Sequence, residues 1–196
     1  MPMSPAPKLL FLAGSTRRES LNRKLARVAA EMAGTRGAEV TLVELADYPM
    51  PIYNGDLEAA EGLPENARAL KARFREHAGF FIAAPEYNSS LTPLLKNTLD
   101  WISRRESADE PRLSAYTGKV AGLGAASGGR LGGLRGLVPL RMMLGNIGVH
   151  VVPAQMALAN AAEAFDDEGA LHDPAQVQML ETVLDQLITT ARRLSA

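Results

Sequence analysis

The fold of this chain is decided by the stretch Phe80-Phe81-Ile82-Ala83-Ala84-Pro85-Glu86-Tyr87-Asn88-Ser89-Ser90-Leu91-Thr92-Pro93. Residues 79–84 are apolar without alternation, which predicts a strand buried on both faces. Thr92 followed by Pro93 predicts a helix start, because a hydroxyl can cap free amides and proline suits the first helical position. Residues 85–88 are therefore expected in a loop at the carboxyl end of a central strand, where open α/β sheets bind ligands.

Apolar, β-rich runs alternate with helical patterns along the whole chain. Strands are predicted at 8–13, 39–45, 79–84, 119–126 and 149–153, and helices at 20–33, 64–77, 93–104, 134–147 and 174–194. This alternation predicts a three-layer α/β sandwich with a parallel sheet in the flavodoxin-like order 2-1-3-4-5. In that order the loops after strands one and three face each other across a crevice. We expect a single domain at 8–196, after a disordered or extended segment at 1–7.

The composition is that of a globular protein, with 196 residues, 46% hydrophobic and 22% charged. A formal net charge of −1 gives no field for nucleic acid or an anionic membrane, and it differs from the strong acidity of small electron carriers. The absence of cysteine excludes disulfides, thiolate nucleophiles and Cys-ligated metals. No signal-peptide pattern opens the chain and no apolar run approaches roughly 20 residues. The sequence therefore predicts a cytoplasmic protein without nucleic-acid or membrane partners.

The loop after the first strand has the residue types of an anion site. It contains a glycine, then hydroxyls, an arginine and the start of a helix: Gly14, Ser15, Thr16, Arg17, Ser20, Leu21 and Asn22. Hydroxyls, free helix amides and a guanidinium all donate to anions. The G-x-G-x-x-G dinucleotide pattern and the triphosphate pattern are absent, so a terminal phosphate suits this loop best. The alternative is a capped helix with solvated arginine side chains.

The loop after the fourth strand is rich in glycine and contains Ser127, Gly128 and Gly129. Glycine at a strand end lets the backbone approach a ligand closely, and Ser127 with the amides after it can bind a carbonyl or a ring edge. The alternative is a flexible loop without a ligand.

Ser127 also favours a second interpretation, a serine hydrolase. The pattern Ala-x-Ser-x-Gly is close to the nucleophile elbow, and Asp166 or Asp167 with His172 would supply the partners in chain order. The first glycine of the elbow is missing, and the histidine lies only a few residues after the acid. No metal site is predicted, because the histidines lack ligand spacing.

Three loops thus point to one crevice. A ligand with a phosphate at one end and a planar, hydrogen-bonding ring at the other would satisfy all of them, and flavin mononucleotide (FMN) is such a ligand. In this arrangement Pro85, Glu86, Tyr87 and Asn88 would hold the ring, with Tyr87 over a face or an edge.

The motifs resemble those of the NADPH-dependent FMN reductase family. Its phosphate loop is matched by Gly14-Ser15-Thr16-Arg17-x-x-Ser20-x-Asn22. Its isoalloxazine loop and the following helix are matched by Pro85-Glu86-Tyr87-Asn88, Leu95-Lys96-Asn97 and Asp100-Trp101. Further matches are Ser127-x-Gly129, Leu140-Arg141, Gly148 and Val151-Val152-Pro153. One departure is Thr92-Pro93, where the family usually carries Pro-Gly.

The resemblance implies bound FMN that takes hydride from NADPH or NADH and reduces a quinone, free flavin, azo compound or metal oxyanion. Because the cofactor carries the chemistry, no protein residue is predicted as catalytic. The family also implies a homodimer or homotetramer in which helices after strands three and four pack across subunits. A non-enzymatic flavodoxin-type electron carrier stays open as an alternative.

Overall fold

The computed structural model describes residues 5–195 and contains a five-stranded parallel sheet in the order β2-β1-β3-β6-β7. The strands are β1 (Lys8–Ala13), β2 (Glu39–Val43), β3 (Gly79–Ala83), β6 (Val120–Ala126) and β7 (His150–Leu158). Numbered within the sheet alone, this is the predicted order 2-1-3-4-5, so the flavodoxin-like architecture is confirmed.

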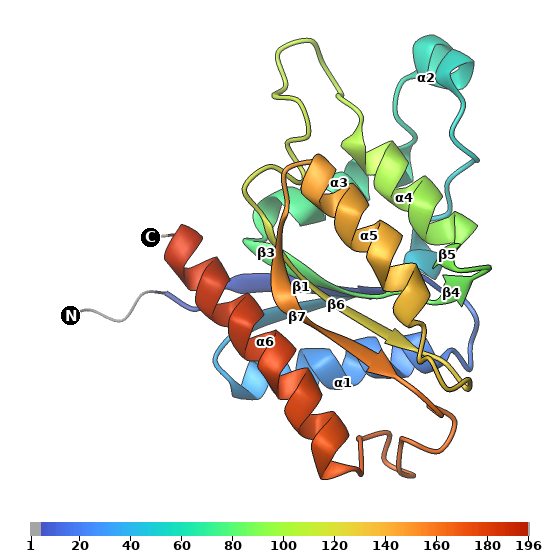
Figure 1. The fold of residues 1–196 in the computed structure, drawn as a ribbon. Helices are drawn as coiled ribbons and strands as arrows, with labels where there is room; N and C mark the ends of the chain where they lie inside the picture. The colour runs from blue at the N-terminus through green and yellow to red at the C-terminus, as the bar shows by residue number, and fades with distance from the viewer. Residues whose placement is uncertain (1–4, 196) are drawn as a thin grey trace.

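Helices cover both faces of this sheet and make three layers (Figure 1). One face carries α1 (Leu21–Thr35) and α6 (Pro174–Leu194), and the other carries α3 (Glu65–Glu76), α4 (Pro93–Ser103) and α5 (Leu134–Asn146). Successive side chains of a strand point to opposite faces. Phe81 of β3 therefore packs in the cluster with α1 and α6, while Phe80 packs in the cluster with α3, α4 and α5. Both rings are almost fully buried, as the unbroken apolar run predicted.

Two predicted strand ends differ from the structure by two residues or more, and both have local reasons. β2 ends at Val43 because a 3-10 turn, η1 (Leu45–Asp47), follows it. β7 continues to Leu158 although Pro153 lies within it. β7 is an edge strand of the sheet, and a proline in an edge strand need not interrupt the hydrogen bonds to the neighbouring strand.

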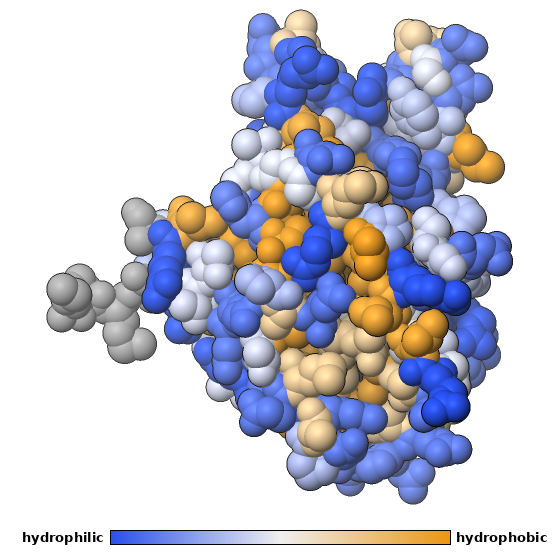
Figure 2. Space-filling view, in the orientation of Figure 1, coloured by the Kyte–Doolittle hydropathy of each residue, from blue (hydrophilic) through white to orange (hydrophobic). Residues whose placement is uncertain are grey.

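Besides η1, two further short elements were not predicted. A helix, α2 (Gly55–Glu61), begins after Asn54, whose side chain caps it. A hairpin of β4 (Glu86–Tyr87) and β5 (Ser90–Leu91) occupies the loop between β3 and α4. Figure 2 shows the molecule hollowed between two projections, which are α2 and the loop that follows α4.

Part of the predicted amino-terminal segment, residues 1–4, lies outside the described residues. At Pro7 the carbonyl already accepts a hydrogen bond from the Glu39 amide at 3.0 Å, so pairing with β2 begins just before β1. Among the helices of residues 5–195, none combines the length and hydropathy needed to cross a membrane.

Candidate active site

The loops after β1, β3 and β6 meet at the carboxyl ends of these strands. The Gly14 amide donates to the Ala83 carbonyl at 2.9 Å, and the Ala84 amide donates to the Gly124 carbonyl at 2.7 Å. A Cβ atom on Gly14 would lie only 3.0 Å from the Leu95 Cβ, so glycine permits this close approach. The first loop is thereby packed directly against the beginning of α4.

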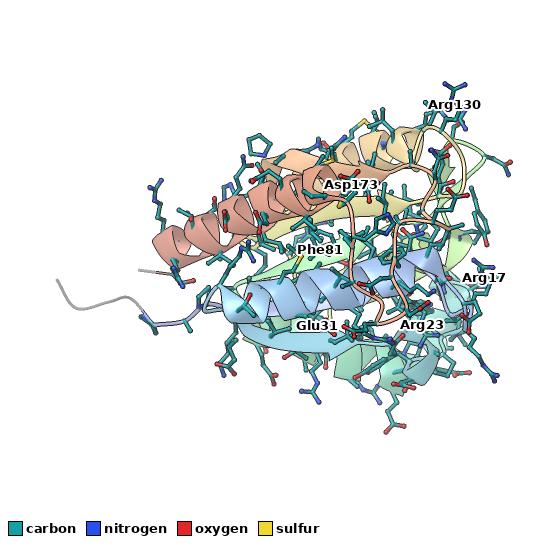
Figure 3. The ribbon with its side chains drawn as sticks, turned by 90° about the horizontal axis from the view of Figure 1, so that it is seen from below. Arg17, Arg23, Glu31, Phe81, Arg130 and Asp173 are labelled. Carbon is teal, nitrogen blue, oxygen red and sulfur yellow. The ribbon has the colours of Figure 1, made fainter. Side chains whose placement is uncertain are left out.

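The phosphate loop, residues 14–22, presents donors around the beginning of α1. Ser20 caps the helix, because its Oγ accepts a hydrogen bond from the Arg23 amide at 3.4 Å. Arg17 is exposed, and no ion pair involves its side chain in the described structure. It projects from the same end of the molecule as Arg130 (Figure 3). A free guanidinium beside free helix amides favours an anion here.

Arg23 holds the backbone of the phosphate loop through contacts with protein groups. Its Nε lies 2.8 Å from Glu44, and its Nη1 donates to the Arg17 carbonyl at 3.4 Å. The ion pair links α1 to the end of β2, while the second contact holds the backbone of Arg17. Arg23 is thus occupied by protein groups, whereas the Arg17 guanidinium remains available.

Asn22 has a structural contact that the sequence did not reveal. Its Nδ2 donates to the Ala126 carbonyl at 2.8 Å, and its Oδ1 accepts from the Ala126 amide at 2.9 Å. The side chain is buried and ties the start of α1 to the end of β6. A direct contact between Asn22 and a ligand stays a prediction.

The loop after β3 is a tight hairpin. Asn88 and Ser89 have φ angles of 51° and 65°, and they form its two-residue turn between β4 and β5. Positive φ at both central positions is the signature of a type I′ turn. Tyr87 precedes the turn and is 59% exposed. The hairpin therefore holds an aromatic side chain at the open edge of the site.

Glu86 joins this hairpin to α5. Its Oε1 accepts from the Arg135 Nε at 2.8 Å, and its Oε2 accepts from the Gly136 amide at 3.1 Å. The residue before α5 is Gly133, which has no side chain to cap the helix. Glu86 supplies that cap from another loop. The sequence predicted Glu86 for the cofactor, and no sequence signal indicated its contact with α5.

The glycine-rich loop is fixed by contacts with β7. The Ser127 amide donates to the Leu158 carbonyl at 3.1 Å, and the Ser127 Oγ accepts from the Gly129 amide at 3.2 Å. Gly132 has a φ of +60°, and a Cβ atom there would lie 2.6 Å from the Ala157 carbonyl carbon. Glycine is thus required for the loop to pass this close to β7.

Two adjoining cavities follow these loops. One has a volume of about 380 Å³ and is lined by Ser15, Arg17, Ser20, Leu21, Asn22, Pro85, Glu86, Tyr87, Ala126, Ser127 and Gly128. The other, of about 420 Å³, shares Glu86 and Ser127 and adds Asn88 and Gly129 among its lining residues. Of the predicted site residues, only Thr16 lines neither cavity. The volumes are typical of small-molecule sites.

This arrangement fits FMN in its chemistry. The end at Arg17 offers a cation, hydroxyls and helix amides for a phosphate. The end at Tyr87 and Ser127 offers an aromatic ring and a close-lying backbone for a planar ring. The two ends belong to one cavity, as a ligand with a phosphate and a ring requires.

A larger cavity, of about 510 Å³, lies away from the strand ends, between α2 and Arg104–Glu106. Its principal charges are already paired, since the Arg104 Nε donates to Glu58 at 2.8 Å. The hydrogen bond from Arg104 lowers the pKa of the Glu58 carboxyl, against the opposing effect of burial. Tyr53 donates to the same carboxylate at 2.8 Å. Size alone therefore does not identify the ligand site.

The hydrolase triad is not assembled. Asp166 Oδ1 accepts hydrogen bonds from the Glu168 and Ala170 amides, which closes a local turn. Within residues 5–195, no hydrogen bond joins the Ser127 hydroxyl to His172 or to an aspartate. Ser127 therefore lacks the base that would activate it.

The sheet order, together with a site at the carboxyl ends of β1, β3 and β6, defines a flavodoxin-like protein. The sequence profile of the family described as NADPH-dependent FMN reductase matches residues 7–163. The chain belongs to this family. Membership confirms the predicted class, an NAD(P)H-dependent flavin oxidoreductase, and it favours neither the electron-carrier nor the hydrolase alternative.

Similar proteins bear names of the same kind. An NAD(P)H:quinone oxidoreductase from Solanum tuberosum is 33% identical over 99% of this chain and 97% of its own length. An NAD(P)H-dependent FMN reductase from Pseudomonas aeruginosa is 31% identical over 98% of this chain and 99% of its own. The solved structure of a flavoenzyme NAD(P)H:acceptor oxidoreductase from Paracoccus denitrificans aligns with a TM-score of 0.79 and 28% identity, covering 96% of this chain and 98% of that one.

Proposed function

We propose that this protein binds FMN in the cavity lined by the phosphate loop, the hairpin and the glycine-rich loop, takes hydride from NADPH or NADH, and reduces quinones or similar acceptors. The acceptor class includes free flavin and other planar molecules or metal oxyanions. The observation that carries the proposal is the convergence of the phosphate loop, the hairpin and the glycine-rich loop on one cavity. Names of relatives support quinone and FMN reduction.

The protein's own residues would bind and orient the cofactor. Arg17, Ser15 and Ser20 would hold the phosphate together with the first amides of α1. The backbone of residues 85–88 and of 127–129 would bond the polar rim of the ring. FMN supplies the hydride chemistry when it is bound, so these residues need only position it and leave one ring face open.

The test is an FMN titration followed by a turnover assay. FMN-free protein should bind FMN at micromolar concentration or below, with a change in the flavin absorbance spectrum. The loaded protein should then oxidise NADPH or NADH when benzoquinone is present. Absence of FMN binding would refute the proposal. FMN binding without nicotinamide oxidation would instead favour the electron carrier.

We also propose that a second copy of the chain packs on α5. Leu134, Val138 and Met142 recur at helical spacing and are 41%, 64% and 64% exposed. Figure 2 shows hydrophobic residues gathered over this helix. Burial of such a stripe would support a homodimer or homotetramer. Light scattering should show an oligomer that Met142→Glu dissociates, and a monomeric unmodified protein would contradict this part of the proposal.

The remaining proposals concern placement. We treat residues 8–196 as one FMN-binding domain, because β1 and α6, from opposite ends of this range, pack in one hydrophobic cluster. We propose a cytoplasmic location, with which a cysteine-free composition is compatible. Fractionation of cells that express the tagged chain tests the location.

A further inference from the structure

We propose that Thr92 is a positioning residue that couples the ring-binding hairpin to the phosphate loop and thereby sets the affinity for FMN. This inference rests on the proposed function. Thr92 lies between β5 and α4 and lines neither cavity, so it would act through other residues. The sequence identified it as the cap of a helix and as a departure from the family pattern, and neither observation indicated a contact with the phosphate loop.

The Thr92 hydroxyl makes two contacts at once. Its Oγ1 donates to the Gly14 carbonyl at 2.8 Å and accepts from the Leu95 amide at 3.2 Å. A hydroxyl has one proton to donate, and Thr92 donates it to the Gly14 carbonyl of the phosphate loop, while its oxygen accepts from α4. Thr92 is 3% exposed, so water does not compete readily for this bond. The same side chain therefore caps α4 and holds the residue from which the phosphate loop begins.

Gly14 is held from both sides at this joint. Its amide donates to the Ala83 carbonyl at 2.9 Å, while its carbonyl receives the Thr92 hydroxyl. A Cβ atom on Gly14 would lie 3.1 Å from the Leu95 Cδ2 and 3.2 Å from the Pro85 Cδ. The glycine is thus wedged between the start of α4 and the end of β3. A shift of Gly14 relative to Thr92 requires the hydrogen bond from the Thr92 hydroxyl to break.

The consequence for binding follows from the shape of FMN. Its phosphate would contact the loop that Gly14 begins, and its ring would contact the hairpin that Thr92 ends. Loops already held at the right separation lose little conformational freedom when the ligand binds. Without the hydroxyl, the Gly14 carbonyl is left unpaired in a buried place and the loop relaxes. A net contribution of one hydrogen bond corresponds to FMN binding weakened about five- to ten-fold.

The experiment compares Thr92→Val, which keeps the shape of the side chain and removes the hydroxyl, with Thr92→Ser, which keeps the hydroxyl. The control is Asp173→Ala, because Asp173 caps α6 through the Ala175 amide at 2.9 Å and has no contact with the site loops in the described structure. This control separates the effect of losing a helix cap from the effect of losing the hydrogen bond between Thr92 and Gly14. FMN dissociation constants are measured by fluorescence quenching, and amide hydrogen exchange is measured on the FMN-free proteins.

Thr92→Val should weaken FMN binding and speed exchange in residues 14–20, whereas Thr92→Ser and Asp173→Ala should leave both near the unmodified values. If Thr92→Val binds FMN within two-fold of the unmodified protein, the inference is overturned and the proposed function stands. If Asp173→Ala weakens FMN binding equally, the effect is general stability and the inference is overturned as well. If no version binds FMN, the proposed function fails, and this inference fails with it.

Discussion

The side chains gathered near the two ends of α4 differ in whether they have protein partners. At its carboxyl end, Lys71 is 1% exposed and bonds to Glu110 at 2.6 Å and to the Arg104 carbonyl at 2.6 Å. At its amino end, where the site loops meet, Arg17 and Tyr87 face solvent without a protein partner for their side chains in the described structure. The buried charges at the carboxyl end are thus paired with protein groups, whereas Arg17 and Tyr87 are left open to a ligand.

Glu110 is the centre of the paired end. It accepts the Glu106 amide at 2.6 Å and the Ser114 hydroxyl, besides contacting Lys71. Burial would raise the pKa of this carboxyl, but the hydrogen bonds from Glu106, Lys71 and Ser114 outweigh it and lower the pKa to about 2. This network fastens the long loop after α4 to α3. It has no contact with the cavities at the strand ends.

The largest expected effect therefore comes from Glu110→Gln. The substitution removes the nearer of two carboxylates beside the buried Lys71 ammonium, the one at 2.6 Å, and leaves only that of Glu106 at 3.6 Å. Breaking a buried ion pair in this way destabilises proteins by about 3–5 kcal/mol. Urea unfolding of the FMN-free protein at pH 7 measures this loss. FMN affinity under native conditions should stay unchanged, because the two ends of α4 serve different purposes. A large loss of FMN affinity in a folded variant would break the comparison.

Acid should act on the same carboxyl. Its pKa is lowered on folding from an ordinary 4.5 to about 2, so its charged form stabilises the folded state at neutral pH. This contribution, about 3 kcal/mol, is lost as the pH falls from about 5 to about 2. The unmodified protein should show that decline in urea unfolding, and Glu110→Gln should show a shallower one. Equal slopes would mean that Glu110 is not the group responsible.

Asn22→Ala is expected to have the next largest effect. Asn22 both holds two elements of the fold together and lines the candidate FMN cavity. It removes two buried hydrogen bonds and leaves the Ala126 amide and carbonyl without their partner, which corresponds to about 2–3 kcal/mol in unfolding free energy. Both stability and FMN affinity should fall, because the same contact joins two site loops. Asn66→Ala is the matched control, since its amide makes one exposed bond to the Pro49 carbonyl. Equal losses in the two variants would contradict a special role for Asn22.

The sequence predicted the order of the sheet correctly, and it predicted which loops meet at the strand ends, because both depend on local patterns. The apolar run in β3 and the Thr92-Pro93 helix start required no knowledge of distant residues. The contacts that assemble the site could not be predicted in this way. Asn22 meets Ala126 and Glu86 meets the start of α5 only after the sheet has formed, and the residues of each pair are far apart in the chain.

Arg17→Ala should affect binding and not folding. If its guanidinium bonds the phosphate, FMN affinity should fall by about 1.5–3 kcal/mol. Unfolding free energy without FMN should be unchanged, because the side chain is exposed. The neighbouring Arg18→Ala serves as the control for a general loss of positive charge. An FMN affinity unchanged in Arg17→Ala would show that the arginine is merely solvated. The phosphate would then have to be bound by other hydrogen-bond donors at the amino end of α4.

Tyr87→Ala should give the smallest change in FMN affinity, about 1 kcal/mol, because an exposed ring at the rim gains only part of a full aromatic contact. Its value lies in separating two roles. If the ring covers the flavin, affinity falls and Tyr87→Phe restores it. If the ring lies on the acceptor side, affinity stays constant while the KM for the quinone rises.

In either case the folded protein should keep its stability, since the Tyr87 ring packs against no other aromatic ring within residues 5–195. A loss of stability in Tyr87→Ala would mean that the residues near this end of α4 also support the fold. Tyr87 and Glu110 would then differ only in how much unfolding free energy each contributes.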